Sequence, residues 1–93
     1  MIEGEIYTLA SGTTFAYKAI DGTYIYHYIC VNDAGDVRVK NVNGTGLLGR
    51  GRSCLATTDQ RAKFFRRIHE EGFHYNQANK VVINQENNQI IEQ

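Results

Sequence analysis

Apolar and polar residues alternate along most of the first half of the chain, which is the pattern of β-strands that bury one face. Short clusters of Gly, Asp, Asn and Ser separate these runs, and such clusters interrupt strands and favour turns. The predicted strands cover residues 5–9, 13–20, 23–31 and 37–42. The sequence therefore predicts an antiparallel meander of three or four strands.

Two turn signals set the register of this meander. Asp21-Gly22 predicts a two-residue type I′ turn that places Ile20 opposite Thr23, and consequently Tyr17 opposite Tyr26. Residues 33–35 predict a three-residue loop in which a glycine takes the left-handed position. That loop places residue 31 opposite residue 37.

With this register the two faces of the sheet differ in composition. One face is aliphatic, and it contains Ala16, Ile20, Ile25, Ile29, Val31, Val37 and Val39 together with Lys18 and His27. The other face contains Phe15, Tyr17, Ala19, Tyr24, Tyr26, Tyr28 and Cys30, and it is bordered by Arg38 and Lys40. One helix of about 14 residues covers a single face. The second face is then closed by curling into a half-barrel, by the tail, by another subunit or by a ligand.

The sequence predicts one amphipathic helix at about residues 58–71. Thr57 or Thr58 caps its start, Thr57 with Gln60 makes a capping box, and Gly72 ends it. The predicted apolar stripe contains Ala62, Phe64, Phe65 and Ile68, whereas Lys63, Arg66, Arg67 and Glu70 face water. A short strand or hairpin follows the helix, and the tail, residues 85–93, is either frayed or a late edge strand. The prediction is a single α+β domain over residues 1–93.

The charges are balanced overall but segregated along the chain. Ten Lys and Arg oppose ten Asp and Glu, so the formal net charge is zero. Residues 38–67 nevertheless contain eight of the Lys and Arg and one Asp, and six of these eight are arginine. Arginine binds phosphate through its forked guanidinium, so this block favours an anionic ligand. Alternatively, basic and acidic blocks neutralise each other within the fold or across a homodimer.

A segment rich in glycine and arginine, residues 44–53, lies inside the basic block. Its letters match a dinucleotide-binding fingerprint, but no helix opens at Gly49 and no βαβ unit surrounds it, so we reject that interpretation. Glycine backbones approach phosphate closely and arginines supply charge, which predicts an anion-binding loop. Its predicted ligand-binding residues are Gly49, Arg50, Gly51, Arg52 and Ser53, supported by Tyr24, Tyr26, Tyr28, Arg38, Lys40, Arg66 and Arg67. The alternative is an ordinary surface loop that the arginines keep soluble.

The sequence predicts neither a catalytic site nor a metal site. The spacings among His27, His69, His74, Cys30 and Cys54 do not match paired zinc ligands, and the thiols are interpreted as small buried hydrophobes. We therefore expect no cofactor and no enzymatic activity. Two cysteines, the absence of a signal-like amino end and the absence of a long apolar run predict a cytoplasmic protein without a membrane segment.

Residues 55–80 resemble a segment of small uncharacterised proteins found in Bacteroidetes genomes and in their phages or mobile elements. The residues that carry this resemblance are Ala56, Thr57, Phe64, Phe65, Gly72, Phe73, Tyr75, Asn76 and Lys80. The resemblance implies no particular activity. It implies a small non-enzymatic binder in the cytoplasm of a bacterial host, including proteins that act in counter-defence by sequestering nucleotide signals or host defence components.

Taken together, these features predict a small binding protein that forms a homo-oligomer and holds an anionic ligand. A nucleotide, a nucleotide-derived signal or a nucleic-acid backbone fits the basic block. The alternative is a protein-interaction or homo-oligomeric module that uses the tyrosine-rich face of the sheet. Salt dependence separates the two, because phosphate binding weakens steeply as ionic strength rises whereas an aromatic interface does not.

Overall fold

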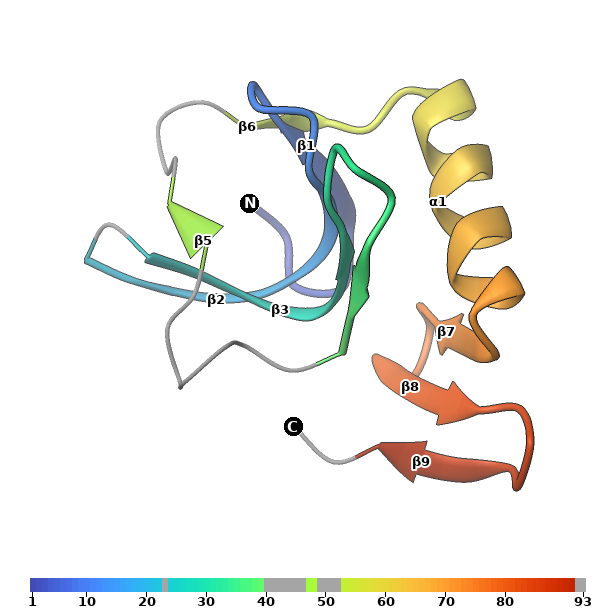
Figure 1. Cartoon of the computed structure of the whole chain (residues 1–93). Coiled ribbons are helices and arrows are strands. Elements are labelled where there is room, and N and C mark those ends of the chain that lie inside the picture. The colour runs from blue at the N-terminus through green and yellow to red at the C-terminus, as the bar shows by residue number, and fades with distance from the viewer. Residues whose placement is uncertain (23, 40–46, 49–52, 92–93) are drawn as a thin grey trace.

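The computed structural model describes residues 1–22, 24–39, 47–48 and 53–91, and its larger sheet is an antiparallel meander. The strands are β1 (Ile6–Leu9), β2 (Thr14–Asp21), β3 (Tyr24–Val31), β4 (Val37–Arg38) and β6 (Ser53–Leu55), in the order β4-β3-β2-β1-β6. A two-residue strand, β5 (Leu47–Leu48), pairs with β3. In the part of the chain that is described, no ladder joins β4 to β6, so this bent sheet is not a closed barrel (Figure 1).

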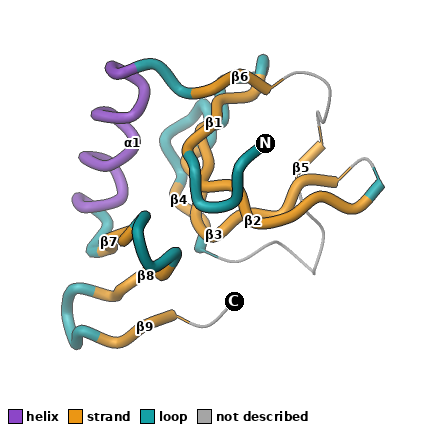
Figure 2. The backbone as a smooth tube through the Cα atoms, turned by 180° about the vertical axis from the view of Figure 1, so that it is seen from behind, coloured by secondary structure: helices purple, strands orange, loops and turns teal. Residues whose placement is uncertain are grey.

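The second half of the chain forms one helix and a smaller antiparallel sheet. The helix α1 spans Thr58–Glu70, and the small sheet contains β7 (Phe73–Asn76), β8 (Val81–Asn84) and β9 (Gln89–Ile91) in sequence order. α1 stands beside the bent sheet and above β7 and β8 (Figures 1 and 2). The predicted α+β class, the helix and the C-terminal hairpin are therefore confirmed, and the tail contributes an edge strand. No described helix is long and apolar enough to cross a membrane.

Local sequence determines where α1 begins and ends. The Gln60 amide N–H donates to Thr57 Oγ1 at 3.2 Å, and the Thr57 amide N–H donates to Gln60 Oε1 at 2.9 Å, which confirms the capping box. Gly72 has φ +88°, a left-handed conformation that glycine adopts without strain, and the chain turns there into β7. The predicted apolar stripe is wrong at Ala62, which is exposed because it lies on the outer side of the helix.

The predicted register of β2 and β3 is wrong because the turn is displaced, and two irregularities follow along the hairpin. Asp21 pairs with Tyr24, so the turn lies one residue later than Asp21-Gly22 predicts. Phe15 pairs with Cys30 and Tyr17 pairs with His27, which leaves one residue of β2 opposite two residues of β3. A second shift follows between residues 17 and 19. Such bulges bend and twist a strand, and the long hairpin is correspondingly bent (Figure 1).

The bulges also redistribute the two predicted faces. Because a one-residue shift moves a side chain to the opposite face, Ile20 and Ile25 pack with Phe15 and Cys30 instead of with Ile29. Tyr28 lies on the face opposite to the predicted one and stacks on Tyr75, with ring centroids 6.2 Å apart. A continuous tyrosine-rich face is therefore not present in the described part of the sheet.

The loop between β3 and β4 has the predicted form. Val31 pairs with Val37, and Gly35 has φ +89°. β4 ends at Arg38, well before residue 42, and residues 40–42 lie outside the described part of the chain. The predicted glycine-arginine loop, residues 44–53, contains β5 and the start of β6, which both pair with strands of the bent sheet.

Apolar side chains gather in two separate clusters. The helix-side core lies between the bent sheet, α1 and the small sheet, and it contains Ile6, Ala16, Ile29, Ala56, Phe64, Ile68, Tyr75 and Val82. The hairpin-side core lies within the first three strands, and it contains Tyr7, Leu9, Phe15, Ile25 and Cys30. The bent sheet therefore buries residues on both of its faces without the help of a second helix.

Candidate functional site

A cleft of about 350 Å³ lies where α1 faces two loops of the bent sheet. The helix contributes Gln60, Lys63, Phe64, Arg66, Arg67 and Glu70 to its lining. The sheet contributes Thr8, Gly12, Thr14, Val31, Asn32 and Asp33, from the β1–β2 turn and the start of the β3–β4 loop. We call this space the helix–loop cleft. Its size is at the lower end of the roughly 300–1,000 Å³ typical of small-molecule sites.

Three polar side chains of the lining are hydrogen bonded to one another. Thr8 Oγ1 lies 3.2 Å from Thr14 Oγ1 and donates to Gln60 Oε1 at 3.2 Å. Gln60 is the second residue of the capping box of α1, so this chain of bonds joins the helix start to β1 and β2. The inner wall of the cleft is therefore held in place without a ligand.

Two of the four cationic side chains of α1 have structural partners. Arg61 forms an ion pair with Glu5 at 3.0 Å and also donates to Gln77 Oε1 at 2.8 Å. Arg67 Nε donates to the Gly35 carbonyl at 2.8 Å, and its guanidinium lies 2.6 Å from a Glu71 carboxylate oxygen. The expectation that Arg67 faces water is therefore wrong, because it attaches the β3–β4 loop to the helix.

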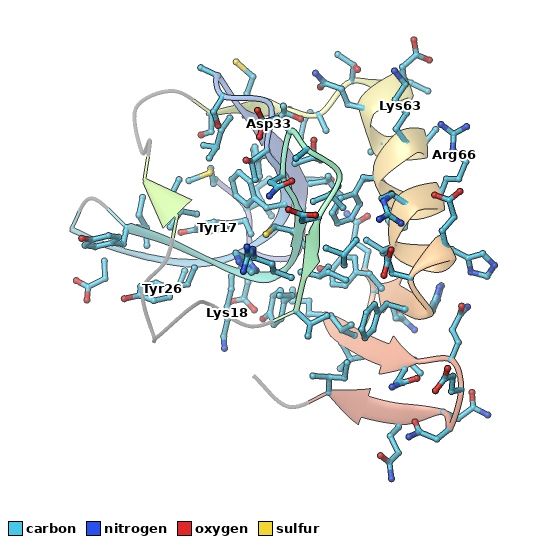
Figure 3. The ribbon with its side chains drawn as sticks, viewed as in Figure 1. Tyr17, Lys18, Tyr26, Asp33, Lys63 and Arg66 are labelled. Atoms are coloured by element: carbon cyan, nitrogen blue, oxygen red, sulfur yellow. The ribbon has the colours of Figure 1, made fainter. Side chains whose placement is uncertain are left out.

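The other two cations of α1, Lys63 and Arg66, are exposed. Within the described part of the chain, neither makes an ion pair, a hydrogen bond or a ring contact. They lie three residues apart, so they are neighbours on the surface of the helix. Figure 3 shows both side chains extending from α1. Their charges are available to an anion at the helix side of the cleft.

The opposite side of the cleft carries an acidic side chain, Asp33. Asn32 Oδ1 accepts the amide N–H groups of Ala34 and Asp36, which fixes the loop and leaves Asp33 at its exposed tip. No described residue forms an ion pair or a hydrogen bond with the Asp33 carboxylate. A Cβ built on Gly12, which has φ +100°, would lie 3.1 Å from the Asp33 Cβ. The β1–β2 turn therefore packs closely against the base of Asp33.

The predicted glycine-arginine site is only partly described. Gly49, Arg50, Gly51, Arg52 and Lys40 lie outside the described residues, so their predicted role stays a prediction. Ser53 begins β6 and is half-buried, and its hydroxyl lies 3.4 Å from Met1 Sδ. Arg38 is exposed on β4, and it does not line the helix–loop cleft.

The three predicted supporting tyrosines are not equivalent. Tyr24 is exposed and Tyr26 is half-buried, and both lie near the end of the hairpin. The Tyr28 hydroxyl donates to Glu3 Oε2 at 2.8 Å, and burial together with Glu3 raises its pKa to about 12. One side of the Tyr28 ring is stacked on Tyr75, so Tyr28 acts as a structural side chain of the helix-side core.

The described histidine and cysteine side chains do not gather into a metal-binding cluster. Among the described residues, no three His, Cys, Asp or Glu side chains are placed to hold a metal ion. Burial raises the pKa of the Cys30 thiol to about 11, so this thiol is protonated near pH 7. Cys54 is exposed, which makes the prediction of two buried thiols wrong for this residue. Its place on the edge strand β6 leaves the side chain in solvent.

His27 is a buried polar side chain of β3 with 2% of its surface exposed. Its Nδ1 atom has no hydrogen-bond partner among the described residues. Burial, followed by the positive charge of Lys18, lowers the pKa of His27 to about 4. The imidazole is therefore neutral at pH 7, and it lines none of the described clefts.

Sequence reasoning anticipated the arginines of the cleft and missed its other charged residues. Arg66 and Arg67 are among the predicted supporting residues, whereas Lys63 was expected only to face water and Asp33 only to form a turn. The i, i+3 spacing of Lys63 and Arg66 is a signal for a paired cationic site on a helix. The loop that faces them is distant in sequence, and no local pattern predicts that contact. Comparison of the chain with protein-family models, with curated proteins and with solved structures gives no match.

Proposed function

We propose that this protein binds a small phosphate-bearing molecule in the helix–loop cleft and does not transform it. The observation that carries the proposal is the division of cations on α1. Arg61 and Arg67 are held by structural partners, whereas Lys63 and Arg66 are unpaired within the described chain and line the cleft. An unpaired guanidinium beside an ammonium offers charge-assisted hydrogen bonds to phosphate oxygens.

The shape and charge of the cleft favour a small molecule over a nucleic-acid backbone. A nucleic acid needs a continuous basic stripe that follows several phosphates. The cleft instead has two carboxylates in its lining, Asp33 and Glu70, beside its three cations. A nucleotide or a nucleotide-derived signal therefore suits the cleft better than an extended polyanion does.

The glycine-arginine segment is a second source of phosphate contacts in this proposal. Arg50 and Arg52 stay predicted ligands on the grounds of their residue types alone. The proposed biological setting, counter-defence in a bacterial host by a phage or mobile element, stands on the resemblance of residues 55–80. In that setting the protein would sequester a nucleotide signal.

Isothermal titration calorimetry with AMP and with inorganic phosphate tests the proposal. In about 20 mM salt we expect AMP to bind, and in about 200 mM salt we expect weaker binding because phosphate contacts are screened. The double variant Lys63→Ala/Arg66→Ala should lose affinity by about tenfold or more. Lys80→Gln is the matched control, because it removes an exposed positive charge that does not line the cleft.

Two results would contradict the proposal. One is the absence of heat for both ligands at low salt. The other is equal affinity in the wild type and in the Lys63→Ala/Arg66→Ala variant. If Arg50→Ala/Arg52→Ala alone abolishes binding, the site belongs to the glycine-arginine segment instead of the cleft.

A protein-interaction module is the second candidate, favoured by apolar side chains on exposed edges. Leu55 on the edge strand β6 is 61% exposed, and Ile90 on the edge strand β9 is 58% exposed. Tyr24 adds an exposed aromatic ring near the tip of the hairpin. Edge strands with apolar side chains are common sites of association. Native mass spectrometry of the purified protein distinguishes the candidates, because it reports a dimer and a co-purified anion separately.

A further inference from the structure

The two walls of the helix–loop cleft carry opposite unpaired charges. Lys63 and Arg66 stand on α1, and Asp33 stands on the loop across the cleft (Figure 3). Within the described chain none of the three has an ion-pair partner. The helix wall also contains Glu70, which lies 3.9 Å from the Arg67 guanidinium, so a ligand that spans the cleft meets the unpaired Lys63 and Arg66 at one end and Asp33 at the other.

Hydrogen bonds made by residues of the lining hold the two walls of the cleft relative to one another. Arg67 holds the Gly35 carbonyl at 2.8 Å, and Asn32 closes the same loop by accepting two backbone amides. The Thr8–Gln60 bond attaches β1 to the first turn of the helix. The helix that carries Lys63 and Arg66 and the loop that carries Asp33 are thus held in place before a ligand arrives.

An ionised carboxylate accepts hydrogen bonds and repels other anions. Asp33 is consequently complementary to hydroxyl or amine donors, and it disfavours a second phosphate at its end of the cleft. The lining also includes Val31, which is half-buried and offers an apolar surface to the carbon skeleton of a ligand, whereas Phe64 is almost fully covered by the helix-side core. A cleft of about 350 Å³ has room for more than a phosphate ion.

From this arrangement we infer that the ligand is a phosphate monoester of a polyol, whose phosphate binds Lys63 and Arg66 and whose hydroxyls bind Asp33. Sugar phosphates and ribonucleoside monophosphates share this chemistry. The inference rests on the proposed function, and it adds that the cleft recognises the hydroxyl-bearing end of the ligand. Asp33 is in this view the residue that determines specificity.

Calorimetric titration of the full-length protein with three probes tests the inference. The probes are ribose 5-phosphate, AMP and n-propyl phosphate, which is a monoester without hydroxyls. We expect ribose 5-phosphate to bind about tenfold more tightly than n-propyl phosphate, because charge-assisted hydrogen bonds to Asp33 are lost in the latter. If AMP binds more tightly than ribose 5-phosphate, the ligand is a nucleotide. If the two bind with equal affinity, the ligand is a sugar phosphate.

The variant Asp33→Ala should remove this preference, so that ribose 5-phosphate and n-propyl phosphate bind within about twofold of each other. Asp33→Asn provides a variant of nearly the same size that removes only the charge. Asp21→Asn is the matched control, because it removes an exposed carboxylate at the end of β2. Far-ultraviolet circular dichroism verifies that each variant is folded.

The outcomes separate the inference from the proposed function. If all three probes bind equally to the wild type, or if the preference survives in Asp33→Ala, the inference is wrong and the anion site stands. If none of the probes binds, both are wrong. If n-propyl phosphate binds and responds to Lys63→Ala/Arg66→Ala while Asp33→Ala abolishes the preference, both are supported.

Discussion

The two apolar cores of this protein are assembled from different ranges of the chain. The hairpin-side core is built from β1, β2 and β3, which are consecutive in sequence. The helix-side core joins those same strands to α1, β7 and β8, which arrive from the other half of the chain. The first core thus forms from neighbouring segments, and the second requires long-range association.

The candidate site lies beside the helix-side core, which requires long-range association. The helix–loop cleft opens where α1 meets the loops of the bent sheet, and Phe64 belongs both to the cleft lining and to the helix-side core. The polar bonds beside that core, such as Arg61 with Glu5, also join distant segments. The anion site therefore depends on the long-range core, whereas the hairpin-side core supports the sheet that α1 packs against.

The largest expected effect comes from removing a ring of the helix-side core. Phe64 is 2% exposed, so Phe64→Ala should lower the free energy of unfolding by about 3–5 kcal/mol. Chemical denaturation measures this loss. In this variant the rate of amide hydrogen exchange should increase mainly in residues 58–91, and the β2–β3 hairpin should retain more protection.

Phe65→Ala is the control, since Phe65 is only half-buried against the same core and its loss should be smaller. A uniform rise in exchange throughout the chain would contradict the distinction between the two cores.

The second effect concerns His27 on the hairpin. Its pKa of about 4 in the folded protein lies below the ordinary value of 6.5, so the unfolded chain takes up the proton first as pH falls. Stability is unaffected above pH 6.5, declines between pH 6.5 and 4, and loses about 3 kcal/mol below that window.

Denaturation at pH 7 and at pH 4 measures the decline. His27→Leu removes the titrating group, and its loss of stability over the same interval should be smaller by about that amount. Equal pH dependence in the two proteins would show that the pKa of His27 is the same in the folded and the unfolded protein.

A third prediction compares two stacked tyrosines. The Tyr75 hydroxyl is buried and donates to the Gly4 carbonyl at 2.7 Å, so Tyr75→Phe should cost about 1–2 kcal/mol by leaving that acceptor without a partner. The Tyr28 hydroxyl donates to Glu3 in an exposed position, so Tyr28→Phe should cost about 0.5 kcal/mol or less. Thermal or urea unfolding of the two variants measures the difference, and the reverse order would argue against the buried bond.

The smallest effect is local to the start of α1. Thr57→Ala removes the capping side chain and should reduce the free energy of unfolding by about 1 kcal/mol. The neighbouring Thr58→Ala should be nearly neutral, because the Thr58 side chain is exposed and does not serve as the cap. If the two substitutions cost the same, the capping box contributes nothing beyond helix propensity.

Local patterns in the sequence determined most of the secondary structure. Thr57, Gln60 and Gly72 define α1 because capping bonds and left-handed glycine involve residues a few positions apart. Gly35 likewise determines the turn between β3 and β4. The order of the first four strands follows because consecutive antiparallel strands pair through short loops.

Only the tertiary structure decided which side chains share a face and which charges remain unpaired. Each bulge in the hairpin shifts the register by one residue. The sequence pattern does not locate the bulges, because apolar and polar residues alternate along the strand both before and after each of them. The separation of Arg61 and Arg67 from Lys63 and Arg66 depends on Glu5 and Gly35, which are more than 30 residues away. The candidate site arises from those distant partners, because they determine which cations of one helix are left for a ligand.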